Sequence, residues 1–273
     1  MPLTTSVDGA KIYYETHGSG PAVLLVHGSG GHHAAWWQQV PWFRDQYTVI
    51  TIDLRGFGSS DSSFDEYDSR VFPDDILAVL RDAGVPKAVL VGQSIGAAAA
   101  LKAALRAPEL AAGVVLAHSL GGIDDAELST LVDADRAEAV KLPVLDRLLT
   151  PAFREHDPAK TFLFRQMGTF NAAKMADLRN LNSDGPTVAE VVASGLPICF
   201  LAGEKDAVLS AATVRRAAAK VTGSVLELVT DAPHSMYWEA PVLFNEALAR
   251  FLQRVYPETA SASTLPSPAG ATA

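Results

Sequence analysis

A serine between two glycines is the residue whose type and surroundings most directly indicate chemistry. Residues 89–91 form a short apolar run typical of a buried strand, and residues 97–107 are rich in alanine and leucine, which predicts a helix. Ser94 lies where the two meet, in the pentapeptide Gly-Gln-Ser-Ile-Gly. The chain must reverse sharply there, and Gly92 and Gly96 leave room for neighbouring backbone. The pattern therefore predicts a nucleophilic serine in a strained turn, with the amides of the next helix directed at the reaction centre.

Other short motifs follow expected strands. The apolar run 22–26 ends in His-Gly-Ser-Gly-Gly at residues 27–31, and the strand expected over 47–52 ends in Asp-Leu-Arg-Gly-Phe-Gly. Gly-Glu-Lys-Asp at residues 203–206 and Pro-His at residues 233–234 come late in the chain. The glycine-rich loop lacks the spacing and the Lys-Ser/Thr ending of a P-loop, and it does not fit the dinucleotide-binding fingerprint. A phosphate-binding role for this loop is therefore disfavoured.

Together these motifs resemble those of the α/β-hydrolase fold superfamily, and they are spread over most of the chain. The resemblance implies a catalytic triad of Ser94, Asp206 and His234, which occur in the chain order expected of this fold. It also implies an oxyanion hole formed by the backbone amides of Ser29 and Ile95.

Two other places could contribute to the site. His118 directly follows the apolar run 113–117, at the edge where such sheets bind ligands, and contact of its side chain with substrate stays open. Asp124 or Asp125 could supply the triad acid, although the position of Asp206 fits better. The remaining histidines are expected in structural or surface positions: His27 beneath the oxyanion loop, and His17, His32, His33 and His156 at the surface.

The implied chemistry is cleavage of a small carboxylic ester or lactone through an acyl-serine intermediate. His234 would take the proton from Ser94, and Asp206 would hold the imidazole in the required tautomer. No cofactor and no metal are expected, because the chain has no His-x-x-x-His pattern, cysteine pair or carboxylate cluster at ligand spacing.

Three alternative functions use the same residues. Carbon–carbon bond hydrolases of vinylogous diketones typically carry Trp directly after the catalytic histidine, where this chain has Ser235. A perhydrolase or cofactor-free haloperoxidase has the same triad as an esterase. A hydrolase-fold small-molecule receptor with little turnover is the alternative from another class, because fold alone does not prove function. Dehalogenases and epoxide hydrolases are disfavoured, since they need a carboxylate in place of Ser94.

The order of expected elements predicts an α/β fold. Strands alternate with helices, which indicates a mostly parallel, doubly wound sheet of about eight strands with helices on both faces. A hairpin is expected around Asp8-Gly9 at the start of the chain.

This alternation stops between about residues 123 and 195, where amphipathic helical stretches occur without a convincing strand. The resemblance places a lid here, after the sixth strand. We therefore expect a core of residues 1–122 and 196–256, a helical cap of residues 123–195 that includes a helical stretch over 171–181, and a disordered tail. The tail, residues 257–273, is rich in Ala, Ser, Thr and Pro.

Composition limits the partners. There are 22 Lys and Arg residues against 31 Asp and Glu, and the net charge of −9 argues against a nucleic-acid surface. No apolar run is long enough to cross a membrane and no signal peptide is evident, so a cytoplasmic protein is expected. Cys199 is the lone cysteine, which leaves no disulfide framework. The expected partner is a small-molecule substrate, with no nucleic acid or membrane, and monomer and homodimer both stay open.

Overall fold

The structure is a computed structural model that describes residues 2–63, 67–181 and 183–262. In this part of the chain eight strands form one sheet in the order β1-β2-β4-β3-β6-β7-β9-β10. The pairs β1–β2 and β2–β4 are antiparallel and the other neighbours are parallel, which confirms the mostly parallel sheet. The strands are β1 Leu3–Thr5, β2 Lys11–His17, β3 Ala22–Val26, β4 Thr48–Ile52, β6 Ala88–Gln93, β7 Ala111–Ala117, β9 Ile198–Gly203 and β10 Val225–Val229.

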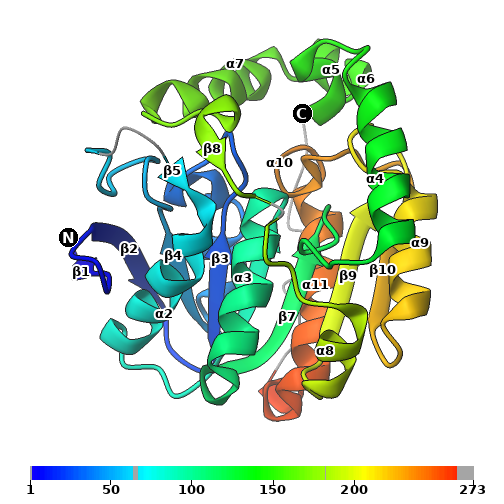
Figure 1. Cartoon of the computed structure of the whole chain (residues 1–273). Helices are drawn as coiled ribbons and strands as arrows, with labels where there is room; N and C mark the ends of the chain where they lie inside the picture. Colours follow the sequence, from blue (N-terminus) through cyan, green and yellow to red (C-terminus); the bar gives the residue numbers. More distant parts are fainter. Residues whose placement is uncertain (1, 64–66, 182, 263–273) are drawn as a thin grey trace.

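Helices cover both faces of this sheet (Figure 1). One buried apolar cluster joins one face to α2, α3 and α9, and a second cluster joins the opposite face to α10 and α11. The α-helices are α1 Val40–Phe43, α2 Phe72–Asp82, α3 Ile95–Arg106, α4 Ala126–Ala139, α5 Val144–Leu148, α6 Pro151–His156, α7 Pro158–Met167, α8 Val188–Ala193, α9 Ala211–Lys220, α10 Met236–Glu239 and α11 Pro241–Val255.

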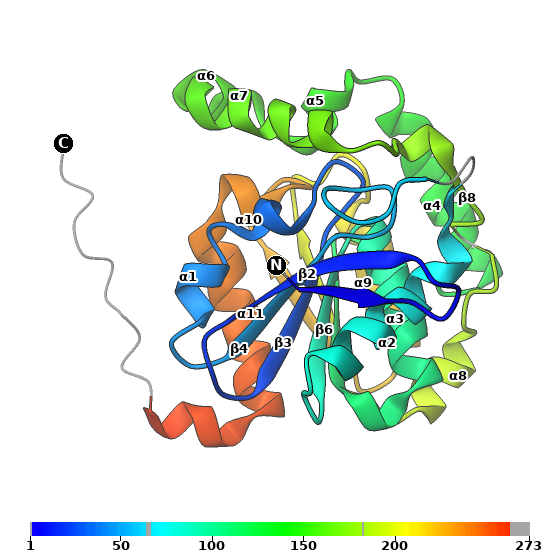
Figure 2. The ribbon, with the colours of Figure 1, turned by 90° about the vertical axis from the view of Figure 1, so that its left-hand side faces the viewer.

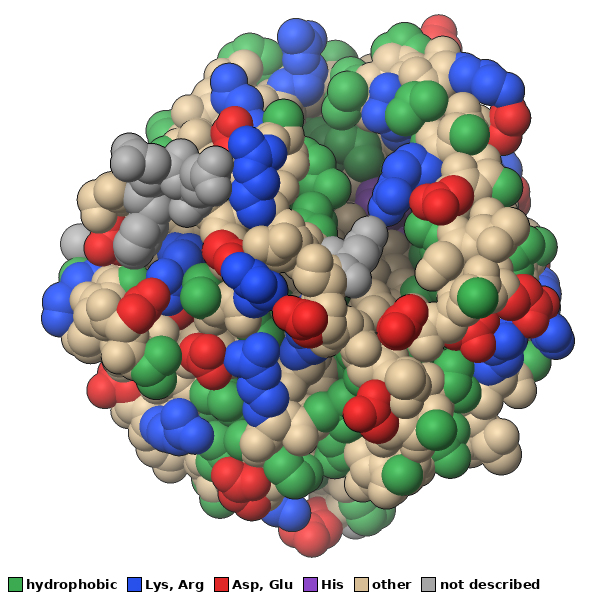
Figure 3. Space-filling model, viewed as in Figure 1, with side chains coloured by type: hydrophobic (Ala, Val, Ile, Leu, Met, Phe, Trp, Pro, Cys, Tyr) green, Lys and Arg blue, Asp and Glu red, His purple; other side chains and the backbone are tan. Residues whose placement is uncertain are grey.

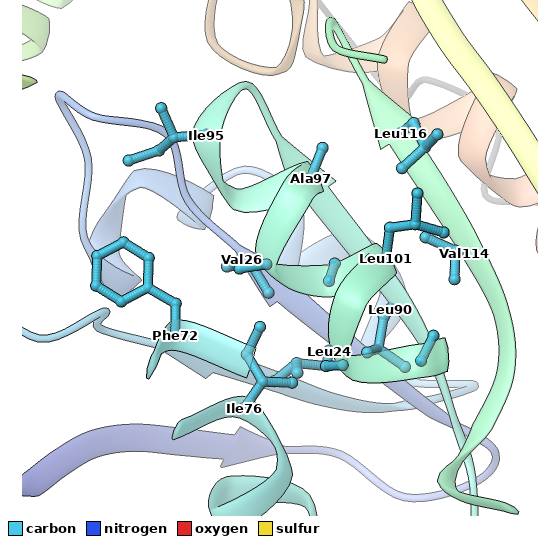
Figure 4. Close-up of a cluster of buried hydrophobic side chains, with 14 of the residues drawn as sticks. Leu24, Val26, Phe72, Ile76, Leu90, Ile95, Ala97, Leu101, Val114 and Leu116 are labelled. Carbon is cyan, nitrogen blue, oxygen red and sulfur yellow. The ribbon is translucent and has the colours of Figure 1, made fainter. Parts of the chain in front are cut away.

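The two clusters follow from the alternation of side chains along each strand. In β3, Leu24 packs with the first cluster and Leu25 with the second, because successive side chains point to opposite faces. Figure 4 shows Ile76 of α2 beside Leu24, and Phe72 of the same helix belongs to the same cluster. Burial of each such side chain stabilises the fold by about 1.5–3 kcal/mol. The packed sheet thereby fixes the carboxyl ends of its central strands, where the candidate residues lie.

Most of the segment between β7 and β9 lies over the carboxyl ends of the strands, with α5, α6 and α7 across the top (Figure 2), while α8 lies toward the opposite end of the sheet (Figure 1). It also contains a short strand, β8 Leu178–Arg179, which pairs in parallel with β5 Tyr67–Asp68 of the core. The expectation of a strand-free cap with a helical stretch over residues 171–181 is therefore wrong. The chain instead returns across the core here, and Ala173 N donates a hydrogen bond to Gly56 O at 2.8 Å.

The end of the described chain is also more ordered than expected. Residues 257–262 form the 3-10 helix η6, Pro257–Ala262, which follows α11. Thr259 bonds to Tyr256 O through both its amide, at 3.1 Å, and its hydroxyl, at 2.8 Å. A disordered tail beginning at residue 257 is therefore wrong for these residues, and residues 263–273 lie outside the described part of the chain.

Candidate active site

Ser94 lies in the turn between β6 and α3 with φ 52° and ψ −115°, a backbone conformation that residues other than glycine rarely adopt. The two glycines around it allow this turn. A Cβ atom added to Gly92 would lie 2.4 Å from the Cα atom of Ala97, and one added to Gly96 would lie 2.6 Å from the carbonyl oxygen of His27. Both distances are too short for a side chain, which confirms why the motif needs glycine at these positions.

Asp206 and His234 lie in the loops that follow β9 and β10. The Nδ1 atom of His234 lies 3.0 Å and 2.9 Å from the two carboxylate oxygens of Asp206. Asp206 Oδ1 also accepts hydrogen bonds from the backbone amides of Val208 and Leu209. The two loops approach so closely that a Cβ atom on Gly203 would lie 2.0 Å from a backbone carbonyl oxygen of the His234 loop.

Electrostatics at this site favour an ionised acid. Burial alone would raise the pKa of Asp206, but His234, His118 and their hydrogen bonds hold that pKa far below its usual range. An ionised carboxylate only accepts hydrogen bonds, so Nδ1 of His234 carries the proton. Its Nε2 atom then has the free lone pair that a general base needs.

The sequence leaves the role of His118 open, and the structure places its ring against the carboxylate of Asp206. Its Nδ1 atom lies 3.0 Å from Asp206 Oδ2, and its ring is 5.5 Å from the ring of His234, centroid to centroid. The His118 side chain is fully buried. The position of His118 directly after an expected strand indicates that it lies at the ligand-binding edge of the sheet. Its bond to Asp206 could not be read from the sequence, because it depends on the conformation of the loop after β9.

The alternative acids lie elsewhere. Asp125 accepts a hydrogen bond from the amide of Leu128 at the start of α4, and it pairs with Lys220 at 2.8 Å. Asp124 lines a cavity beside Ser94, but no hydrogen bond joins its carboxylate to a histidine among the described residues. The geometry thus favours Asp206 as the partner of His234.

The loop expected to form the oxyanion hole packs against the serine. A Cβ atom added to Gly28 would lie 3.3 Å from the Cβ atom of Ser94. Ser29 follows in the same loop, and Ile95 is the first residue of α3. Ile95 lines one of the two cavities that contain Ser94 and Ser29 lines the other, and the role of their amides stays a prediction.

His27 supports this loop from below. Its Nε2 atom accepts a hydrogen bond from the amide of Leu54 at 3.0 Å, so its Nδ1 atom must donate to the carbonyl oxygen of Gly28, at 2.8 Å. Burial lowers the pKa of His27 to about 4, which keeps the ring neutral. This is the structural role expected of His27.

His32 and His33 are not the surface residues that were expected. His32 is buried, and His33 is half-buried against the fully buried carboxylate of Asp53. Asp53 accepts hydrogen bonds from both the amide and the ring of His33, and from the amide of Ser59. The turn after β4 folds back over this loop, which the linear sequence does not reveal.

Two cavities meet at Ser94 and His234, and both residues line each of them. The first, of about 270 Å³, lies beneath α4 and has mostly apolar walls. The second, of about 330 Å³, lies between the oxyanion loop, α5 and α7. Figure 3 shows the hollow in the surface, with hydrophobic side chains along it and a histidine inside. A larger cavity, of about 890 Å³, is lined by neither Ser94 nor His234.

Two groups of described residues bring three potential metal-ligand atoms within 4.8 Å of one another. They are the clusters of His32, His33 and Asp53, and of His118, Asp206 and His234. In each, the carboxylate oxygens already accept hydrogen bonds from imidazole and backbone amides. The bonding explains both clusters without an ion. Among the described residues no helix has the length and apolar character needed to cross a bilayer.

Comparison with known proteins agrees with the fold. The chain is 25% identical to 3-oxoadipate enol-lactonase 2 of Acinetobacter baylyi over 258 residues, 92% of this chain and 96% of that protein. Among solved structures, Est816, described as an N-acyl homoserine lactone degrading enzyme, has a TM-score of 0.74 and 26% identity and covers 92% of this chain and 100% of that one. A thermophilic esterase from Thermogutta terrifontis has a TM-score of 0.80 at 24% identity, covers 93% of this chain and 98% of that one, and supports the fold. The sequence pattern of the alpha/beta hydrolase family matches residues 23–247, and the chain belongs to that family.

Proposed function

We propose that this protein is a serine hydrolase that cleaves a small carboxylic ester or lactone through an acyl-serine intermediate. The observation that carries the proposal is the arrangement of three residues. Ser94 is held in a strained turn and shares both cavities with His234, whose Nδ1 atom is bonded to the buried, ionised Asp206. This is the arrangement that nucleophilic catalysis by serine requires.

Each residue has a defined part in the reaction. Nε2 of His234 takes the proton from Ser94 Oγ as that oxygen attacks the carbonyl carbon, and it returns the proton to the leaving alcohol. Water, deprotonated by His234, then cleaves the acyl-serine bond. The amides of Ser29 and Ile95 stabilise the tetrahedral oxyanion, each by about 3–4 kcal/mol. Asp206 stays ionised and balances the positive charge that develops on His234.

The cavities and the relatives support a small substrate. Cavities of about 270 and 330 Å³ on the two sides of the serine leave room for modest acyl and alcohol groups. Two of the relatives, at 25% and 26% identity, are named for action on lactones. A lactone therefore ranks beside an open-chain ester as the substrate class.

The experiment is fluorophosphonate labelling combined with a panel of p-nitrophenyl esters and simple lactones. Wild type is expected to label and to hydrolyse the panel. Ser94→Ala should lose labelling and at least about 10⁴-fold in kcat/KM, because no other residue replaces the nucleophile. Ser224→Ala, in the turn before β10 and outside both cavities, is the matched control and should behave as wild type.

Two results would contradict the proposal. Labelling without turnover of any ester or lactone would leave the nucleophile in place and favour a carbon–carbon bond hydrolase or a receptor. Hydrolysis that survives in Ser94→Ala would show that another residue carries the reaction.

A further inference from the structure

Asp206 accepts more hydrogen bonds than one triad histidine supplies. Its carboxylate is bonded by the amides of Val208 and Leu209 and by Nδ1 of both His118 and His234. The two imidazoles approach it from different strands, since His118 follows β7 and His234 follows β10. One carboxylate is therefore shared by two histidines.

The structure also fixes the protonation of His118. An ionised carboxylate cannot donate, so Nδ1 of His118 must carry a proton. Burial lowers the pKa of His118, which keeps its ring neutral and leaves a lone pair on Nε2. No hydrogen-bond partner for Nε2 is found among the described residues, and the side chain has no exposed surface. Among the described residues, Asp206 is thus the one group that forms a hydrogen bond with the His118 ring.

The backbone at His118 indicates that this placement is costly. His118 has φ 54°, a positive value that is uncommon for residues other than glycine, although histidine adopts it more often than most. Strain of this kind persists where the surrounding structure holds it, and it clusters at functional sites. The His118 ring is buried and forms one hydrogen bond, which it donates to Asp206. An effect of His118 on catalysis would therefore be transmitted through Asp206.

We propose that His118 is a positioning residue that fixes the rotation of Asp206 and limits how strongly this carboxylate favours the protonated form of His234. The donated hydrogen bond takes up part of the negative charge on Asp206 Oδ2. His234 therefore stays neutral, and able to act as a base, at a lower pH than it would beside an otherwise unpaired carboxylate. The inference rests on the proposed function, because it concerns the base of that same triad.

Other charged groups around His234 remain in place when His118 is changed. Asp124, Asp133 and Arg136 line the first cavity with His234, and Arg165 lines the second. Lys205, next to Asp206 in sequence, is paired with Asp231 at 2.7 Å. His118 itself also lines the first cavity, so every variant changes that wall, and the bond to Asp206 is reported by the difference between a variant that keeps a donor and one that does not.

The test compares pH profiles of kcat/KM for wild type, His118→Phe and His118→Asn on one p-nitrophenyl ester. Phenylalanine keeps a ring but has no donor, and the acid limb of its profile should move up by about 0.5–1 pH unit. Asparagine tolerates the left-handed backbone and can place Nδ2 near the position of Nδ1, so its acid limb should lie within about 0.2 pH unit of wild type. A merely structural role would lower the rate at every pH without moving this limb.

Coincident acid limbs for wild type and His118→Phe would overturn the proposal, and so would an equal displacement in both variants. If the phenylalanine variant does not fold, wild-type protein labelled with ¹⁵N-histidine decides the matter. His118 should then be the neutral tautomer protonated at Nδ1 at neutral pH, and the tautomer protonated at Nε2 or a charged ring would overturn the proposal. Absence of ester and lactone turnover by wild type would count against the proposed function, while the NMR result would still decide the role of His118.

Discussion

At the scale of single residues, two buried carboxylates are compensated by histidine rather than by lysine or arginine. Asp206 is bonded to His118 and His234, and Asp53 is bonded to His33. Histidine changes its charge near neutral pH, unlike the other basic side chains. The contribution of the His33–Asp53 interaction to the free energy of unfolding should therefore change with pH near neutrality, where most ion pairs keep their charges.

We expect His33→Gln to destabilise the protein more at pH 6 than at pH 9. Burial alone would lower the pKa of His33, but the hydrogen bond and charge of Asp53 raise it. A raised histidine pKa gives stability that is complete below the ordinary histidine pKa and is lost as pH rises through the folded value. The pKa of Asp53 is lowered, so Asp53 is ionised at both pH values and its contribution does not change between them. Urea unfolding at the two pH values measures the difference.

The exposed His156 provides the control for this prediction. His156→Gln should change the free energy of unfolding little at either pH. Equal destabilisation by His33→Gln at pH 6 and pH 9 would show that its charge does not matter.

At the scale of elements, the nucleophile turn depends on the close packing of β3, β6 and α3. The alanines of α3 let the helix lie near the sheet, and Ala97, Ala100 and Ala103 have no exposed surface. Gly96, in the first turn of α3, faces carbonyl oxygens at the end of β3. The position of the turn is thus fixed by backbone contact, with no room for a side chain.

Gly96→Ala is expected to destabilise the protein by about 3 kcal/mol or more, because its Cβ atom would lie 2.6 Å from two carbonyl oxygens. Gly30→Ala is the matched control, since a Cβ atom there would meet nothing within 4 Å. It should change stability by less than about 0.5 kcal/mol. Urea unfolding of both variants measures this difference, and similar values for the two would refute the packing argument.

The alternation of strands and helices, and the glycines around Ser94, were sufficient to predict the sheet and the nucleophile turn. Strand β8 could not be predicted, because two residues carry no periodicity and its pairing depends on β5, more than a hundred residues earlier. The bonds of His33 and His118 could not be predicted either. Each histidine contacts a carboxylate that is distant in the sequence, so its role is visible when the loops at the sheet edge are placed in space.

At the scale of the whole molecule, the cap is joined to the core at several separate points. Asn171 donates from Nδ2 to the carbonyl oxygen of Gly31 at 3.1 Å and accepts from the amide of Gly58 at 3.0 Å. On the other side, Ser235 N donates to the carbonyl oxygen of Leu148 at 3.0 Å. The segment between β7 and β9 therefore holds both the glycine-rich loop of residues 27–31 and the loop of His234.

We expect Asn171→Leu to lower kcat/KM on a p-nitrophenyl ester by about 10-fold, because small displacements of the oxyanion loop misplace its donor. Buried Gly31 O and half-buried Gly58 N would also lose their partner, which should destabilise the protein by about 1–3 kcal/mol. Thr169→Val is the control, since its hydroxyl bonds within the cap, to Gln166 O. Full activity in a destabilised Asn171→Leu variant would show that the link serves folding alone.

The two cavities draw their walls from different stretches of the chain. Residues of α4 enclose the first, and residues of α5 and α7 enclose the second, while Ser94 and His234 belong to both. Mutations in one stretch can thus change the group accepted on one side of the scissile bond and leave the other side as it was. The two sides of the proposed substrate site can therefore be re-engineered separately, without a change at Ser94 or His234.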